Sequence, residues 1–185
     1  MKKNIFSIVL CFFVISITFS QEKLKAGLTN QFKINYYLTG LDASYEIPLN
    51  NKFTFEAGAG IGAGSFIRSL PFLEESFRID FNTFPVLRLR SKLKYIYNRE
   101  NRIKKGKSID RNSGNYFALQ GTFSSKKEDV ANNILFSELH WGIQRSLGGN
   151  WLFNINAGVG YAKDFNSKLD RFYPTIGLEF SYILL

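Results

Sequence analysis

The feature that most constrains the fold is a strict alternation of apolar and polar residues. In the segment Phe53–Gly64, the odd positions from Phe53 to Ala63 are all apolar, and the even positions carry Thr54, Glu56 and four glycines. A period of two places these two sets on opposite faces of a β-strand. The sequence therefore predicts a β-protein whose strands have two unlike faces.

The alternation recurs along the chain and predicts about eight strands, of which the first is the weakest. The expected strands are Leu24–Tyr37, Leu38–Ile47, Phe53–Gly64, Pro85–Tyr97, Asn115–Ser124, Leu135–Ser146, Trp151–Lys163 and Phe172–Leu184. Most of them have 10–13 residues. Strands in soluble sheets usually have about 5–6 residues, whereas a tilted strand that crosses a membrane needs about 9–11. The lengths therefore favour strands that cross a bilayer.

An internal repeat supports a simple connectivity. A shift of the sequence by 98 positions superimposes two strand–turn–strand segments without a gap, so that Leu41 falls on Leu139 and Phe53 falls on Trp151. A repeated hairpin is typical of an up-and-down meander. Chance similarity between alternating strands is the alternative explanation.

The composition of the two faces decides between a soluble and a membrane protein. The apolar faces are rich in aromatic residues, which make up 16% of the chain, and the polar faces combine glycine with charged residues. A membrane barrel turns its apolar face to lipid and its polar face inward, and closure leaves no backbone group unpaired in hydrocarbon. We therefore expect an all-β fold, a closed antiparallel up-and-down transmembrane β-barrel of about eight strands, whose interior is filled by side chains.

The inward faces are predicted to hold a network of ion pairs, because a buried charge without a partner is very unfavourable. The expected members of this polar network are Glu56, Arg88, Arg90, Lys92, Lys94, Glu138, His140 and Glu179. Glycines on the same faces would leave room for the long side chains and ease the bending of a narrow barrel. These interior glycines are Gly58, Gly60, Gly62, Gly158 and Gly160.

The first residues are typical of a secretory signal peptide. A positively charged start precedes an apolar run from Ile5 to Ile17, and Thr18 and Ser20 are the small residues before Gln21. This pattern predicts a signal peptide of residues 1–20, Sec-dependent export, cleavage near Gln21 and a barrel domain of residues 21–185. The run is shorter than the roughly 20 apolar residues that a membrane-spanning helix needs.

The same pattern bounds the chemistry of the exported chain. The only cysteine of the full sequence, Cys11, lies in the predicted signal peptide and would be removed with it. The only histidine is His140. With carboxylates scattered along the chain, no metal site is predicted. The net charge of +9 falls to +7 when Lys2 and Lys3 are removed. A basic exported chain is expected to meet anionic lipid or lipopolysaccharide and no nucleic acid.

One segment matches a nucleotide-binding expression. Gly58 to Ala63 has the pattern G-x-G-x-x-A, and Asp80 follows at a spacing suitable for a ribose contact. A dinucleotide fingerprint must follow a strand and open a helix, whereas here the strand alternation continues through the glycines. We interpret the match as accidental and predict no cofactor.

The alternation also predicts which connections share an end. With both termini in the periplasm, the turns Pro48–Lys52 and Leu147–Asn150 are short, as expected, and the outward connections 65–84, 125–134 and 164–171 are longer. The connection from Asn98 to Gly114 is the exception, because it should be short and is long. Its basic residues within 99–111 are interpreted as a solvated, flexible turn, with a site for an anionic partner as the alternative.

Three segments resemble the small outer-membrane β-barrel proteins of Bacteroidota. They are Tyr45–Phe53 with Glu56–Gly62, Asn101–Lys107 and Asn112–Leu119. The resemblance covers most of the mature chain and implies a location in the outer membrane, contact with its lipids and insertion by the outer-membrane assembly machinery. It also implies that the long basic connection is a family trait. It implies no particular activity, because that family is largely uncharacterised.

His140 is the one candidate for catalysis. Small barrel lipases and lipid A deacylases use a serine, a histidine and an acid at the membrane, and Glu138 lies on the same strand face as His140. However, position 142, two residues from the histidine, is glycine. An interior histidine within a polar network is the favoured interpretation, and no catalytic residue is predicted.

We therefore expect a non-enzymatic outer-membrane barrel with an ion-paired interior and a structural or surface-interaction role through its extracellular loops. The main alternative is a lipid-modifying enzyme or a carrier of small hydrophobic ligands built on the same barrel. A soluble periplasmic barrel of the lipocalin type is a third possibility.

Overall fold

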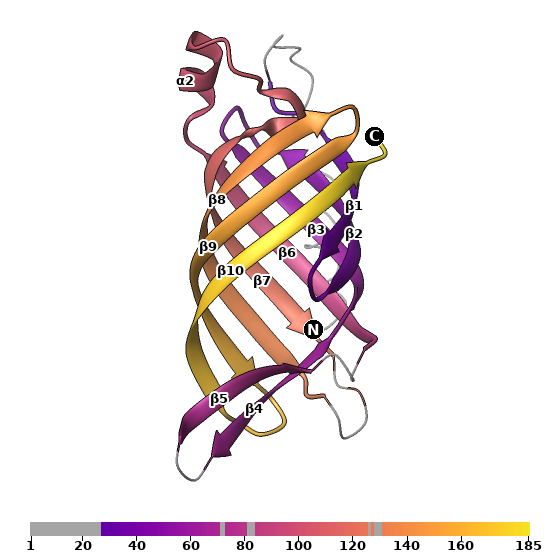
Figure 1. Ribbon diagram of the computed structural model, residues 1–185, viewed down its shortest axis with the longest axis vertical. Helices are drawn as coiled ribbons and strands as arrows, with labels where there is room; N and C mark the ends of the chain where they lie inside the picture. The colour runs from indigo at the N-terminus through magenta and orange to yellow at the C-terminus, as the bar shows by residue number, and fades with distance from the viewer. Residues whose placement is uncertain (1–26, 71–72, 81–83, 126, 128–130) are drawn as a thin grey trace, which may run out of the picture.

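The computed structural model describes residues 27–70, 73–80, 84–125, 127 and 131–185. The predicted signal peptide and its cleavage site lie outside these residues. Eight antiparallel strands close into a barrel in the order β1-β10-β9-β8-β7-β6-β3-β2 (Figure 1). The strands are β1 (Gln31–Tyr37), β2 (Gly40–Pro48), β3 (Phe53–Gly62), β6 (Val86–Ile96), β7 (Gly114–Ser124), β8 (Ile134–Gly148), β9 (Trp151–Asp164) and β10 (Asp170–Ile183). The prediction of an all-β, closed, eight-stranded antiparallel barrel is confirmed.

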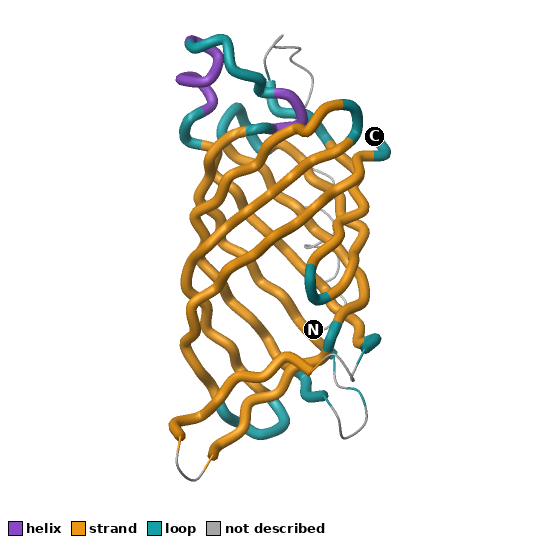
Figure 2. Tube along the Cα trace, viewed as in Figure 1, coloured by secondary structure: helices purple, strands orange, loops and turns teal. Residues whose placement is uncertain are grey.

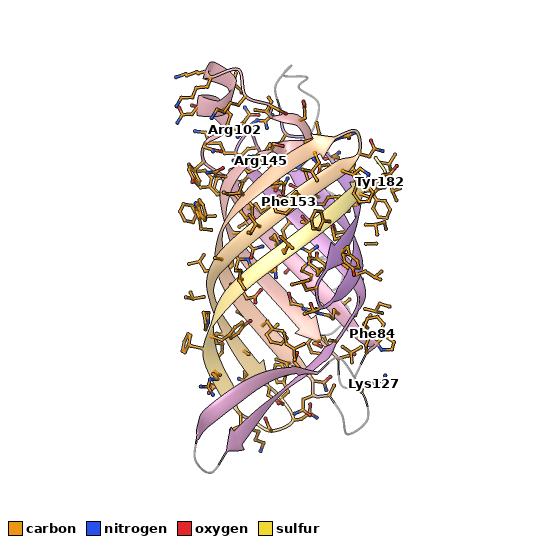
Figure 3. The ribbon with its side chains drawn as sticks, in the orientation of Figure 1. Phe84, Arg102, Lys127, Arg145, Phe153 and Tyr182 are labelled. Atoms are coloured by element: carbon orange, nitrogen blue, oxygen red, sulfur yellow. The ribbon has the colours of Figure 1, made fainter. Side chains whose placement is uncertain are left out.

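The wall of the barrel separates two kinds of side chain. Phe55, Trp141 and Phe180 lie on the exposed outer surface, whereas Glu56, the neighbour of Phe55 in β3, is buried. Figure 3 shows Phe153 and Tyr182 on the wall close to the end that carries Arg102 and Arg145, with Lys127 at the opposite end. The outer surface is therefore apolar between two polar ends, and charged side chains in the middle of the strands, such as Glu56 and Lys92, lie inside.

The two ends of the barrel differ in their connections. The end with the short β2–β3 and β8–β9 turns also carries the C-terminus and the β6–β7 connection (Figure 2). The opposite end carries the β7–β8 and β9–β10 connections and a hairpin of β4 (Gly64–Leu70) and β5 (Leu73–Asp80), whereas the β1–β2 turn points the same way but lies part-way along the wall. Residues 65–84 were expected to be a loop, but β4 and β5 pair with each other as a separate two-stranded sheet that projects beyond the barrel.

The long β6–β7 connection is folded. It contains helix α2 (Arg99–Lys104) and the short 3-10 helix η2 (Asp110–Asn112). Arg99 is buried, and one of its guanidinium nitrogens donates a hydrogen bond to the carbonyl of Gly27 at 2.7 Å. The interpretation of this basic segment as a flexible turn is wrong in this respect, because contacts with the barrel end hold part of it in place. Among the described residues, no helix is long and apolar enough to cross a membrane.

An ion pair outside the barrel wall also fixes α2. The Lys52 ammonium lies 2.9 Å from the Glu100 carboxylate, joining the β2–β3 turn to the helix. The hydrogen bond from Lys52, together with its charge, holds the pKa of Glu100 below the usual 4.5. Both side chains are exposed, so this contact orients the helix more than it stabilises the protein.

The barrel wall is incomplete where the first and last strands meet. β1 pairs with β10 only from Glu179 to Ile183, and β1 ends at Tyr37, the partner of Glu179. β10 continues along β9 as far as Asp170. Among the described residues, no strand pairs with the other edge of Pro174–Leu178. A gap in the strand pairing therefore lies between the lower part of β10 and the β1–β2 turn.

Candidate functional site

The centre of the barrel holds two carboxylates bridged by two lysines. Glu46 of β2 and Glu56 of β3 lie directly opposite each other, an arrangement that is unfavourable for like charges. Lys33 Nζ lies 2.7 Å from Glu46 and 2.6 Å from Glu56, and Lys94 Nζ lies 2.9 Å and 3.5 Å from the same two carboxylates. All four side chains are at most 1% exposed. The lysines therefore hold together a pair that would otherwise repel.

A second group of charges continues the network toward the hairpin end. Arg90 lies 2.9 Å from Asp42 and 2.7 Å from Glu56, and Lys92 lies 3.4 Å from Glu179. Among the described residues, the network contains four cations and four carboxylates, so its formal charge is zero. Its members are Lys33, Arg90, Lys92 and Lys94 with Asp42, Glu46, Glu56 and Glu179.

Neutral polar side chains complete the packing at this level. Gln31, Thr54 and Gln144 are each at most 1% exposed, and Asn154 accepts a 2.7 Å hydrogen bond from the Tyr116 hydroxyl. Side chains that line a water-filled channel remain accessible to solvent. Because these inward-facing residues are buried, side chains fill the interior of the barrel at this level.

The β6–β7 connection covers the network at the C-terminal end. Asn112 of η2 is 2% exposed, and its amide donates to the carbonyl of Thr29 at 2.9 Å and to Glu46 at 3.3 Å. Gln144 links the same segment to Lys94, because its amide donates to the Asn112 carbonyl and its oxygen accepts from the lysine at 3.0 Å. The segment that was expected to be solvated therefore contributes a buried residue to the site.

The sequence-predicted residues fall into two groups. Glu56, Arg90, Lys92, Lys94 and Glu179 belong to the buried network. The structure places Arg88, Glu138 and His140 apart from it, in a cavity nearer the hairpin end.

Sequence reasoning missed three members of the network. Asp42 and Glu46 alternate with Leu41 and Ile47 on β2, so the period of two already placed them on the polar face. Lys33 was missed because it lies in the weakest expected strand, whose inward face was not assigned. For Asp42 and Glu46 the signal was therefore present in the sequence.

The five predicted glycines lie on the inward-facing positions of β3 and β9, and two of them make room for neighbours in the cavity. A Cβ at Gly62 would lie 2.6 Å from Cδ of Arg88, and a Cβ at Gly160 would lie 2.5 Å from the ring of Tyr173. Neither distance is tolerated by real side chains. The other three are Gly58, Gly60 and Gly158, where an added Cβ would meet the neighbouring strand.

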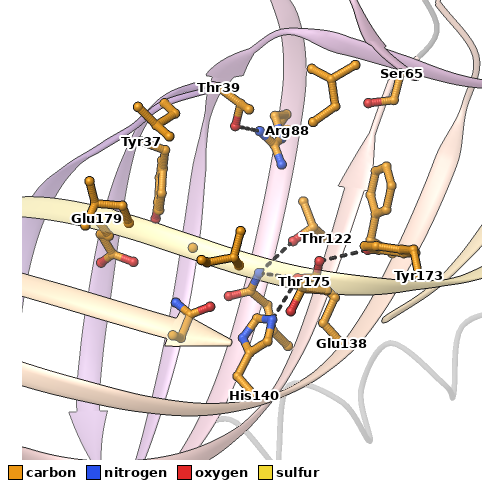
Figure 4. A pocket seen from close by; sticks show the side chains of 18 of the residues that line it. Tyr37, Thr39, Ser65, Arg88, Thr122, Glu138, His140, Tyr173, Thr175 and Glu179 are labelled. Atoms are coloured by element: carbon orange, nitrogen blue, oxygen red, sulfur yellow. Dashed lines mark hydrogen bonds and ion pairs between the residues drawn. The ribbon is translucent and has the colours of Figure 1, made fainter. Parts of the chain in front are cut away.

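The cavity has a volume of about 670 Å³ and lies between the network and the hairpin end. Figure 4 shows Glu138, His140 and Tyr173 on one side of it, with Arg88 and Thr39 on the other. Lys92 and Glu179 of the network also line it. The cavity therefore ends where the ion-paired interior begins.

Three groups fix the Glu138 carboxylate inside the cavity. The Tyr173 hydroxyl donates to Glu138 at 2.7 Å, the Gln120 amide donates at 2.8 Å, and His140 Nε2 lies at 3.4 Å. The other ring nitrogen, Nδ1, is buried and has no hydrogen-bond partner among the described residues. The histidine and the carboxylate are thus paired, as an acid–base couple would be.

A nucleophile for this couple is not in place. Among the described residues, no serine or threonine hydroxyl is hydrogen bonded to His140, and Ser137 lies on the exposed outer face of β8. The first requirement of serine catalysis is a hydroxyl within hydrogen-bonding reach of the base. No group of three or more potential metal ligands occurs among the residues that the structure describes.

Arg88 also lines the cavity. In the described part of the chain it forms no ion pair. It is half-buried, and its guanidinium donates a 2.9 Å hydrogen bond to the Thr39 hydroxyl in the β1–β2 turn. Arg88 also contributes to a second, smaller cavity that Thr39 and Arg90 border. The cavity therefore contains a guanidinium whose charge is not matched by a bound carboxylate.

Comparisons of the chain with protein-family models, with curated proteins and with solved structures give no match.

Proposed function

We propose that the chain is a non-enzymatic integral protein of the outer membrane, whose barrel spans the bilayer and whose ion-paired interior prevents the passage of solutes. In this proposal its role is structural or depends on surface interactions through the connections at the hairpin end. The observation that carries the proposal is the contrast between the wall and the lumen. Large apolar side chains such as Leu89, Phe117 and Val159 are exposed, whereas Lys33 and Glu56 are buried.

The height of the apolar wall matches a bilayer. Along β9, outward-facing positions run from Trp151 to Tyr161 without a charged residue, a distance of ten residues. With a rise of about 3.3 Å per residue and a tilt of about 40°, this span is roughly 25 Å tall. Apolar bands of about 25 Å are typical of outer-membrane barrels.

Aromatic residues lie together near one boundary of this band. The Trp141 indole donates a 3.0 Å hydrogen bond to the Tyr97 hydroxyl, and the rings of Trp151 and Tyr182 are 5.1 Å apart. Phe53 stacks on Tyr95 at the same end. Amphipathic rings are favoured at the level of lipid headgroups. This belt supports a membrane boundary beside the β8–β9 turn and α2, the end that faces the periplasm in this proposal.

The alternatives receive less support from the geometry. A soluble barrel of the lipocalin type would expose the whole apolar wall to water, where large contiguous apolar patches are rare. A lipid-modifying enzyme would need a nucleophile beside His140. A carrier of small hydrophobic ligands built on the same barrel is better supported, because the barrel contains a cavity.

Fractionation of cells that express the full chain, combined with a heat-modifiability gel, tests the proposal. The protein is expected in the detergent-extracted outer-membrane fraction, and the folded band is expected to shift when the sample is boiled. Recovery in the soluble periplasmic fraction without detergent would refute the membrane placement.

The non-enzymatic part is tested by mass spectrometry of lipid A and phospholipids from cells with the native chain and with His140→Ala. Identical lipid profiles are expected, and a product that disappears in the variant would overturn this part.

A further inference from the structure

We propose that the cavity binds a single-chain anionic amphiphile, with one alkyl chain and a carboxylate or phosphate head, which enters sideways from the membrane through the gap between β10 and the β1–β2 turn. This inference rests on the membrane placement proposed above. It assigns a ligand class and an entry route to a cavity that the structural role leaves unused. Its four supports are the gap, the shape of the cavity, the chemistry of the strand edge and the unmatched arginine.

The cavity is not confined to the lumen. In β10, Thr175 and Gly177 occupy inward-facing positions, whereas Pro174 and Ile176 occupy outward-facing positions, and all four line the same cavity. Residues of both faces border one space because that space reaches the edge of the strand that faces the gap. The cavity therefore extends through the gap in the strand pairing to the outer surface of the barrel.

The opening has an apolar rim. Ile176 is 84% exposed and Leu38, in the β1–β2 turn on the other side of the gap, is 75% exposed. Ile79 at the base of the hairpin also lines the cavity and is exposed. Such side chains suit a passage for an alkyl chain, because hydrocarbon is their favourable environment. A polar solute approaching from water would have to pass this rim.

The edge of β10 is adapted to lie open beside lipid. The backbone N–H of Leu184 donates to the carbonyl of Phe32 in β1 at 2.8 Å, so even-numbered residues of β10 direct their backbone groups to the β1 side. Pro174 is even-numbered and lies beyond the last β1 partner, at a position where a backbone N–H would point into the gap. Proline has no N–H, and an unpaired donor in hydrocarbon is very unfavourable. Proline therefore removes one donor from the open edge, while the N–H of Ile176 still points toward the gap.

The head group is inferred from charge. Because the buried network is balanced, Arg88 adds a positive charge to the cavity beside the opening. The Glu138 carboxylate in the same cavity is hydrogen bonded to Tyr173 and Gln120 and lies beside His140, and among the described residues it forms no ion pair with Arg88. A guanidinium binds a carboxylate or a phosphate through two parallel hydrogen bonds. An anionic head at Arg88, with its chain along the rim, therefore complements both parts of the site.

The size of the cavity agrees with this ligand class. Pockets for small ligands usually have about 300–1,000 Å³, and this one has about 670 Å³. One alkyl chain with its head can occupy such a space.

The test uses the purified full chain in lipid nanodiscs and a palmitate analogue that carries a photoreactive diazirine. Peptide mapping is expected to place the crosslinks on residues 173–178 and on Leu38. A uniform distribution of crosslinks around the outer wall would overturn the inference, because it would indicate ordinary contact with surrounding lipid. Competition with unlabelled palmitate and with lysophosphatidate is expected to remove the crosslinks, whereas removal by inorganic phosphate would show that the site takes the free ion.

Two variants test the head and the opening separately. Arg88→Met is expected to weaken palmitate binding at least about tenfold and to leave hexadecanol binding unchanged, whereas Arg88→Lys, which keeps the charge but not the two parallel hydrogen bonds, is expected to lie between the two. Ile176→Trp narrows the opening and is expected to slow binding, while Leu119→Trp, on the outward face of β7 and three strands from β10, serves as the matched control. Equal palmitate affinity in Arg88→Met and the native chain would refute the role of the arginine.

The two proposals can fail separately. Each variant is first checked by heat modifiability, so a folding defect is seen before binding is measured. A chain found in the soluble fraction refutes the membrane placement. A chain that is folded in the membrane but gives no localised crosslinks refutes only the ligand site.

Discussion

The charged residues of the interior depend on one another more than surface charges do. Glu46 and Glu56 are direct partners on the neighbouring strands β2 and β3, and the ammonium groups of Lys33 and Lys94 each lie between the two carboxylates. Removing one partner of a buried pair leaves an uncompensated charge, whereas replacing both by apolar residues removes the need for compensation. Substitutions here should therefore be strongly non-additive.

A double-mutant cycle at Lys33 and Glu46 tests this dependence. Lys33→Met alone is expected to reduce the free energy of unfolding by about 3–5 kcal/mol, and the double variant Lys33→Met with Glu46→Leu by clearly less than the sum of the single changes. Urea unfolding of the barrel in lipid, followed by tryptophan fluorescence, provides the measurement.

The exposed pair of Lys52 and Glu100 gives the matched control. It has a similar separation of 2.9 Å but lies in solvent, and Lys52→Met is expected to have no measurable effect on unfolding. Additive losses in the Lys33 and Glu46 cycle would contradict the coupling that the structure indicates.

Among the elements, the β4–β5 hairpin is the one that the barrel does not need for closure. The two strands pair with each other and not with a barrel strand, and Gly62 and Val86 on either side of the insertion are direct partners in the β3–β6 ladder. A tight turn could therefore connect β3 to β6 directly.

Replacing residues 63–85 by an Asn-Gly turn tests this separation. The shortened chain is expected to keep the heat-modifiable band and the β-rich circular dichroism spectrum of the native protein. Its affinity for the palmitate probe is expected to fall, because Ser65 and Ile79 of the cavity are removed. Failure of the shortened chain to fold would mean that the hairpin contributes to barrel assembly.

Sequence reasoning located the barrel strands, but it did not predict the structure of the connections or how far β1 and β10 pair. The alternation located all eight barrel strands because side-chain period is a local property. The β4–β5 hairpin was expected to be a loop, and the connection 98–114 a flexible turn, because tertiary contacts such as those of Arg99 and Asn112 decide their structure. The gap beside Pro174 could not be predicted, since it depends on where β1 ends relative to β10 in space. Similarly, the alternation placed Arg88 on the inward face but could not show that it lacks a carboxylate partner.

For the whole molecule, the filled interior predicts a barrel without a channel. In a planar bilayer, the reconstituted native chain is expected to show no steady ion conductance, because its central side chains are fully buried. The variant with both Lys33→Ala and Glu56→Ala removes two of the largest buried side chains and is expected to pass small ions if it folds, as judged by the boiled and unboiled bands. Steady conductance by the native chain would contradict a closed interior.

The short contact between the first and last strands has a consequence for the strength of the whole fold. Five positions pair β1 with β10, whereas thirteen pair β10 with β9. A barrel is expected to open first between the two strands that share the fewest hydrogen bonds. Here these are the first and last strands of the barrel, β1 and β10. When heat or mechanical force unrolls the molecule, β1 and β10 should separate before any other pair, and refolding should end with the same contact.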